Sequence, residues 1–538
     1  MKRLNSLLVI MCACVFCTHA QTPLDWHLRS LGPDSIWGAG IEKAYQLLDG
    51  KKAKKKVRVA VISRGFDIEH EDLVDVLWTN KKEKPGNDAD DDKNGYADDV
   101  HGWNFLGTKD GRDVIYTSEA ASRKFDGIRA RFEELNDKGR SRTQEETAEY
   151  MRYLNLVRDS KVESAYMSSV FSRNIAKGME EIDQKLRETF PNDSDFTYEQ
   201  FMKIIPAPEK QDSLNDMAYN VNMLIWGFSP QQMWSDRYKI RDKSAISYEE
   251  QYQALKARQK DERGIIGDNM GDIDDDKYGN ANLLTGNPSV GTGLAGVIAA
   301  KRGNDIGIDG IADNAELMLI RAVPEGDGYD KDMAVAIRYA IKNGADIILL
   351  AMHKKVAEDE EIVRQALDEA EQKNILIVHA AGESPRNIDD SPTYPSGLKA
   401  DGSYYANFIN VAASDVDGLP LHLSNYGKKN VDLFAPGVDV YSCDAGDNYF
   451  KLTGTNASAA VVAGVAALIK SRFPKLTAAQ IKESIVTTAT NAPTEGVFYP
   501  FMSEASNVSP TPARYSELCK SGGIVDAAAA VQKAMNIK

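Results

Sequence analysis

The sequence is poor in cysteine, and after its first 20 residues it contains no stretch apolar enough to cross a membrane. Three of its five cysteines lie in those first 20 residues, which leaves only Cys443 and Cys519. Two cysteines can form at most one disulfide bond, so a scaffold built on disulfides is excluded. The two thiols either pair with each other or remain separate.

Clustered positive charge is also missing from the chain. There are 65 Lys and Arg against 80 Asp and Glu, which gives a net charge of -15. The densest basic run, at residues 51–56, is short and leads directly into an apolar run. Because binding to phosphates requires clustered Lys and Arg, nucleic acid is not an expected partner.

The first 20 residues have the pattern of a secretory signal peptide. Two basic residues open the chain, residues 7–16 are apolar but too few to span a bilayer, and residues 18–20 suit cleavage. We therefore expect a mature chain of residues 21–538 that is secreted or periplasmic and has no transmembrane segment. A lipid anchor at Cys14 or Cys17 is the alternative.

From about residue 285 onward, short apolar runs alternate with runs of helical periodicity. Residues 346–350 and 375–380 are typical of buried strands, and residues 360–373 between them place apolar side chains at helical spacing. Residues 57–62 form an earlier strand-like run. The alternation predicts an α/β fold with a doubly wound, mainly parallel sheet and helices on both faces. The other expected elements are strands at 317–323 and 408–412 and helices at 331–342, 456–472 and 525–535.

Residues 109–263 differ from the rest of the chain. They are rich in Glu, Lys, Arg, Gln, Met and Ala, and apolar side chains recur at helical spacing, as at Ile128, Phe132 and Leu135. We expect a helical insertion that interrupts one large domain of residues 21–538, and we call residues 109–263 the helical segment. It is either a packed, solvated subdomain or the carrier of a binding surface.

Four ordered stretches outside the helical segment carry a distinctive pattern: residues 59–62 followed by Gly65, residues 291–300, residues 434–437 and residues 454–468. Together they resemble the subtilisin family. Residues 59–62 followed by Gly65 are similar to the strand that ends in the family's catalytic Asp, and residues 291–300 to the helix that begins at its catalytic His. Residues 454–468 are similar to the helix that begins at the nucleophilic Ser, and residues 434–437 are a further landmark. The resemblance implies a subtilisin-like α/β fold outside the helical segment.

The residues that this family uses for catalysis are missing at the matching positions. Ser63 stands at the position of the carboxylate, Val290 at that of the histidine and Asn456 at that of the nucleophilic serine. Glu383 replaces the oxyanion-stabilising Asn, and an ionised carboxylate only accepts hydrogen bonds. His353 replaces a glycine that lies against substrate in the family. Since serine peptidases need a nucleophile, a base and a carboxylate, we expect an inactive homologue, or pseudoprotease.

This reasoning predicts a non-catalytic binding or regulatory module with an unidentified protein or peptide partner. Two alternatives remain. One is an active secreted serine-type endopeptidase with an unrecognised site. The other is a structural or adhesive protein that acts through the helical segment.

An acidic loop at residues 90–98 has the pattern of a calcium site. Alternating oxygen-bearing residues around a glycine turn match the ligands that Ca²⁺ prefers. The usual Glu at the twelfth position is absent, because His101 stands there. The loop is either a calcium site or a solvated acidic turn. The expected ligands are Asp90, Asp92, Asn94, Tyr96 and Asp98.

Overall fold

The computed structural model describes residues 22–32, 35–204, 230–239, 241–489, 492–501 and 510–537. The expected signal peptide, residues 1–20, lies outside the described residues.

A seven-stranded sheet forms the centre of the fold, with the strand order β2-β3-β1-β4-β5-β6-β7. Every pair of neighbouring strands in it is parallel. Parallel neighbours need crossover connections, so the expected α/β fold with helices on both faces is confirmed. The strands of the sheet are β1 (Val57–Ser63), β2 (Gly102–Asn104), β3 (Ala315–Arg321), β4 (Ile347–Leu350), β5 (Leu376–Ala380), β6 (Phe408–Ser414) and β7 (Leu433–Pro436).

The central strand β1 lies between β3 and β4, with Val61 opposite Leu319 on one side and Leu349 on the other. Successive side chains point to opposite faces of a strand. Val61 therefore enters one hydrophobic core and Ile62 the other. Burial on both faces explains why this strand is a continuous apolar run in the sequence.

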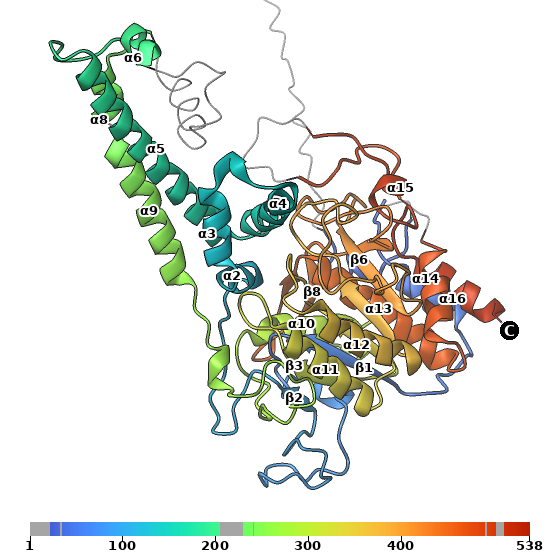
Figure 1. The fold of residues 1–538 in the computed structure, drawn as a ribbon. Coiled ribbons are helices and arrows are strands. Elements are labelled where there is room, and N and C mark those ends of the chain that lie inside the picture. The colour runs from blue at the N-terminus through green and yellow to red at the C-terminus, as the bar shows by residue number, and fades with distance from the viewer. Residues whose placement is uncertain are drawn as a thin grey trace, which may run out of the picture.

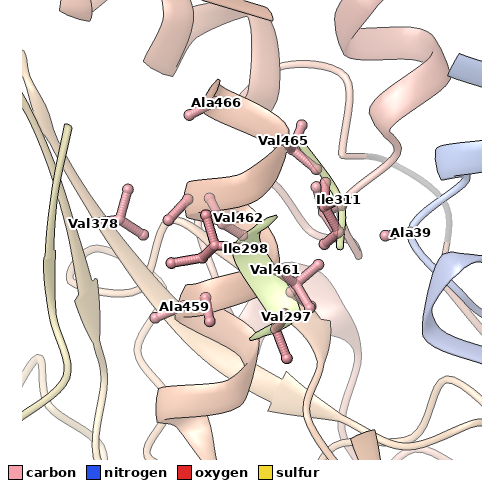
Figure 2. Close-up of a cluster of buried hydrophobic side chains, with 14 of the residues drawn as sticks. Ala39, Val297, Ile298, Ile311, Val378, Ala459, Val461, Val462, Val465 and Ala466 are labelled. Atoms are coloured by element: carbon pink, nitrogen blue, oxygen red, sulfur yellow. The ribbon is translucent and has the colours of Figure 1, made fainter. Parts of the chain in front are cut away.

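One face of the sheet is covered by α10 and α13, which also pack against each other. Figure 2 shows Val297 and Ile298 of α10 gathered with Val461 and Val462 of α13 in one buried cluster. Nearly every residue of α13 is buried, as an all-apolar helix requires. The helices of this layer are α1 (Ile41–Leu47), α10 (Pro288–Ala299), α13 (Thr455–Arg472), α14 (Ala478–Val486) and α16 (Ala527–Asn536).

The other face is covered by α11 (Asp330–Lys342) and α12 (Glu360–Gln372), which bury their apolar sides in the second core. These helices match the sequence expectation to within one residue at each end. The sequence did not indicate β2, β7 or the antiparallel hairpin of β8 (Val440–Asp444) and β9 (Asn448–Leu452), which lies beside α10. The short helix α15 (Tyr515–Leu518) lies near the carboxyl terminus.

Within the helical segment, α5 and α9 run side by side and extend away from the sheet (Figure 1). Phe132 and Leu135 are buried there in a hydrophobic cluster of their own. The division of the chain into one domain and an insertion stays a prediction. The helices of the segment are α2 (Ala120–Asp126), α3 (Arg129–Asp137), α4 (Gln144–Arg158), α5 (Lys161–Thr189), α6 (Tyr198–Ile204), α8 (Trp234–Lys239) and α9 (Arg241–Arg258). Single 3-10 turns are η1 (Trp26–Leu28), η2 (Val74–Val76), η3 (Gly139–Ser141) and η5 (Arg263–Ile265).

Among the described residues, no helix combines the length and the apolar character that crossing a membrane requires. Cys443 and Cys519 are both buried and both unbridged. Burial raises the pKa of the Cys443 thiol well above its usual value.

Candidate functional site

The positions singled out by the sequence lie where strands of the sheet end and α10 and α13 begin. The start of α10 is joined to the loop after β1, because the Asp67 N–H donates to the Thr292 hydroxyl at 2.8 Å. The start of α13 is joined to the loop after β5, because the Gly382 N–H donates to the Thr455 hydroxyl at 3.1 Å. We call this end of the sheet, with the loops after β1, β3, β4 and β5, the strand-end face. Ligands of parallel α/β sheets bind at such carboxyl ends.

Ser63 is the last residue of β1 and is completely buried. Its backbone oxygen accepts hydrogen bonds from Ala322 and Val323, both at 3.2 Å. Its hydroxyl has no hydrogen-bond partner among the described residues. Val290, in the first turn of α10, is half-buried and packs against the larger core. Neither side chain can carry charge or act as a base.

Asn456 is the second residue of α13 and is half-buried. Its side-chain oxygen Oδ1 is shielded from solvent and has no hydrogen-bond partner within the described part of the chain. An amide is neither a useful nucleophile nor a base. Asn456 therefore offers a hydrogen-bond acceptor and an amide donor at the start of α13.

Glu383 follows β5 and caps the start of α13. Its Oε1 accepts the Thr455 N–H at 2.6 Å and the Thr455 hydroxyl at 2.7 Å. A carboxylate at this end of a helix satisfies free N–H groups and interacts favourably with the helix dipole. Gly454 has a φ of 138°, a backbone conformation that residues with a side chain rarely adopt, and a Cβ there would lie 2.8 Å from the same Oε1.

His353, in the loop after β4, contacts Glu383. The Glu383 N–H donates to His353 Nε2 at 3.3 Å, so Nδ1 carries the proton of the neutral ring. Nδ1 has no hydrogen-bond partner among the described residues. Burial lowers the pKa of His353, and the Glu383 carboxylate offsets part of this shift. His353 is thus a neutral hydrogen-bond donor beside a carboxylate.

His379 is fully buried near the end of β5. Burial lowers its pKa to about 4, and its Nδ1 lies 2.9 Å from Asn410 Oδ1. It is a neutral histidine of the core.

The acidic loop brings three carboxylates together, but not the set that the sequence predicts. Ligand oxygens of Asp90 and Asp92 and of the upstream Glu83 all lie within 4.8 Å of one another. Asp98 is not part of this group, and its carboxylate accepts the N–H groups of Gly86 at 2.9 Å and Asp88 at 2.8 Å. Glu83 was missed because no fixed spacing links it to the loop. That Asn94 and Tyr96 act as calcium ligands stays a prediction.

Sequence reasoning also missed the buried carboxylate of Asp72. It is 1% exposed, and its Oδ1 accepts the Asn304 amide at 2.8 Å. Its Oδ2 has no hydrogen-bond partner in the part of the chain that the structure describes. Burial is the main cause that raises its pKa. An unpaired buried carboxylate oxygen is a group that a bound cation would satisfy.

Residues 242–501 match the family model described as "Subtilase family". Over 220 residues, the chain is 33% identical to subtilisin BL of Lederbergia lenta, and the match covers 40% of this chain and 77% of that relative. The chain belongs to the subtilase family. This subtilase is also 35% identical over 219 residues to a thermostable alkaline protease of Halalkalibacterium halodurans. That match covers 39% of the chain and 57% of the relative, so the subtilase spans little more than half of that protein's length.

Solved structures similar to this subtilase are also named as proteases. A protease of Pseudoalteromonas arctica has a TM-score of 0.37 and 27% identity, with 48% of this chain and 74% of that chain covered. A prenylagaramide maturation protease has a TM-score of 0.37 and 20% identity, with 46% and 82% covered.

These findings correct the functional expectation. The sequence led to a non-catalytic binding or regulatory module, because Ser63, Val290 and Asn456 cannot form the family's triad. That expectation is contradicted, since the matched family and the relatives are peptidases and proteases by name. The alternative of a secreted endopeptidase with an unrecognised site agrees better with them.

Proposed function

We propose that this subtilase hydrolyses peptides at its strand-end face as a secreted endopeptidase whose chemistry does not use the family's triad positions. The single observation that supports it is the match to subtilisin BL, which covers 77% of that protein. Ser63, Val290 and Asn456 lack the required groups, so the chemistry is assigned to other residues of the same face.

The side chain suited to proton transfer there is the carboxylate of Glu383, whose backbone N–H donates to His353 Nε2 at 3.3 Å. In this proposal a water molecule attacks the peptide carbonyl carbon and its proton passes to the Glu383 carboxylate. The C–N bond breaks as the leaving amine takes that proton from Glu383, and the carboxylate is restored. His353, whose Nδ1 is shielded from solvent, is a positioning residue that holds Glu383 through the contact of its Nε2 with the Glu383 N–H. The buried Thr455 hydroxyl is engaged by Glu383 and Gly382, so it is not offered as a nucleophile.

The test is turnover of fluorescent casein and of internally quenched peptides by the purified protein. Glu383→Gln and His353→Gln should each reduce kcat at least about 10-fold, whereas the control Asn456→Ala should stay within about twofold. A fluorophosphonate probe, which needs an activated serine, should not label the protein. Labelling would show that an activated serine, and not water, is the nucleophile, and it would overturn the assignment to Glu383.

A second candidate is that the strand-end face is catalytically silent. The three replaced triad positions favour it, because together they supply neither a nucleophile nor a base. This candidate is selected over the first if the parent and the Glu383→Gln variant have the same turnover and neither exceeds the background of a mock purification.

Secretion is part of the proposal and rests on the amino-terminal sequence. The basic start, the apolar residues 7–16 and the small residue Ala20 direct the chain out of the cytoplasm in this interpretation. The amino-terminal sequence of the mature protein should begin at Gln21. Lipid labelling at Cys14 or Cys17 would contradict it.

Calcium is proposed as a structural cofactor. Among the described residues, the carboxylate group of Glu83, Asp90 and Asp92 fits a hard cation, and the unpaired Oδ2 of Asp72 supplies a single carboxylate ligand elsewhere. Bound Ca²⁺ would neutralise repelling carboxylates and so hold these loops in place.

A further inference from the structure

The helical segment is fastened to the strand-end face by its two ends. We call residues 115–123 and 259–263 the foot of the helical segment. The Glu325 N–H donates to the Ile115 oxygen at 2.8 Å, and the Thr117 N–H donates to the Glu325 oxygen at 2.9 Å. The Thr117 hydroxyl also donates to the Asp327 oxygen at 2.9 Å. The foot therefore pairs like an added strand with the loop that follows β3.

Charged side chains that are largely withdrawn from solvent hold the first end of the foot. Arg123 Nε lies 2.5 Å from Glu358 Oε1, and Glu358 also bonds to Lys354. Lys354 pairs with Asp330 at 2.8 Å, and its Nζ donates to the Gly328 oxygen at 3.0 Å. The side chain of Lys354 is only 1% exposed. It thus crosses from the loop after β4 to the loop after β3 and occupies the space between them.

The second end of the foot is held in the same way. Arg263 pairs with Asp332 at 2.8 Å, and their side chains are 3% and 0% exposed. Glu262 accepts the Ile115 N–H at 2.8 Å and joins the two ends of the foot to each other. Within the same segment, Asp159 pairs with Arg386 of the loop after β5 at 3.1 Å. Buried ion pairs of this kind contribute little net stability, but they disfavour arrangements that would leave one of the charges buried and unpaired.

An extended polypeptide commonly binds by adding its main chain to a free strand edge. On this subtilase the edge presented by Glu325 and Asp327 is already hydrogen-bonded to the foot. We propose that the foot is a fixed barrier that keeps extended polypeptides off the β3–β4 side of the strand-end face. Peptides are then confined to the side formed by β5 and α13, next to Glu383. This inference rests on the proposed function, because it takes the ligand of the strand-end face to be a peptide.

The test compares the full-length parent with Arg123→Gln/Glu358→Gln, which removes both charges of the ion pair and leaves Lys354 paired with Asp330. A second variant, Gly326→Ala, disturbs the same contact without changing charge, because a Cβ there would lie 2.0 Å from the Thr117 oxygen. The matched control is Asp110→Asn/Arg112→Gln, an exposed ion pair in the same segment. The ligands are fluorescein-labelled casein, as an extended polypeptide, and a fluorescein-labelled alanine tetrapeptide.

Hydrogen exchange at the amides of Thr117 and Glu325 should accelerate at least about 10-fold in both variants and stay unchanged in the control. The dissociation constant for casein should fall at least about 10-fold in both variants, while that for the tetrapeptide stays within about twofold. The barrier is overturned if hydrogen exchange accelerates in the variants but casein does not bind them more tightly. It is also overturned if casein binds the parent tightly and slows hydrogen exchange at residues 325–328. If neither ligand binds to any of the proteins, both the barrier and the proposed function are overturned.

Discussion

The Glu383 carboxylate lies against the first turn of α13 and accepts both the N–H and the hydroxyl of Thr455, at 2.6 and 2.7 Å. The side chain of Glu383 thus caps the helix that carries Asn456, and the backbone N–H of the same residue donates to His353. Stability and any chemistry at the strand-end face are therefore linked through the same residue.

Glu383→Ala should destabilise the protein by about 1–2 kcal/mol, because it removes a helix cap and a favourable charge at the start of α13. Glu383→Gln keeps an oxygen acceptor and should cost about half as much. The measurement is equilibrium unfolding in urea, monitored by circular dichroism. Equal stability of the parent and the Glu383→Ala variant would mean that the contact with Thr455 does not hold the helix.

His27 should make the protein less stable in mild acid. Burial lowers its pKa from 6.5 to about 4, and both ring nitrogens lack partners among the described residues. Between these two values the unfolded chain binds the proton more readily, so stability is full above pH 6.5 and falls as pH decreases toward 4. The loss reaches about 3 kcal/mol for a shift of this size.

The check is the free energy of unfolding at several pH values between 7 and 4. His27→Phe should flatten the curve over this range, whereas the exposed control His422→Gln should keep the slope of the parent. If the stability curve of His27→Phe runs parallel to that of the parent, other groups cause the acid sensitivity.

Millimolar Ca²⁺ should raise the melting temperature relative to a chelator, because a ligand that binds only the folded state stabilises it. At a concentration about 100 times its Kd the gain is about 2.7 kcal/mol. Asp92→Asn and Asp72→Asn should each reduce the response. Asp91→Asn, a neighbour outside the carboxylate group, should respond like the parent. A response unchanged in both Asp92→Asn and Asp72→Asn would exclude these two sites.

Serine-peptidase chemistry should return only after several repairs. Asn456→Ser supplies a hydroxyl without a base, and adding Val290→His gives a base that no carboxylate holds. Ser63→Asp completes the triad, yet Glu383 still opposes a developing oxyanion until Glu383→Asn is added. Fluorophosphonate labelling should therefore appear only in the last variants of the series, with non-additive steps. Labelling of Asn456→Ser alone would show that another group of this face serves as the base.

Sequence alone was sufficient for those parts of the subtilase whose pattern is long and periodic. The buried run of β1 and the amphipathic spacing of α11 and α12 gave the α/β fold, since burial on both faces of a parallel sheet leaves continuous apolar strands. The identities at positions 63, 290 and 456 led to the expectation that the family's triad is missing, and that expectation stays a prediction.

Only the tertiary structure decided which distant residues meet. Short strands such as β2, with three residues, have no periodicity that a sequence pattern could reveal. The contact of Glu83 with Asp90 and Asp92, the cap of Glu383 on α13 and the ion pair of Arg123 with Glu358 each join separate loops. Their distances depend on how the chain packs around the sheet, because spacing along the sequence does not determine which loops are adjacent in space.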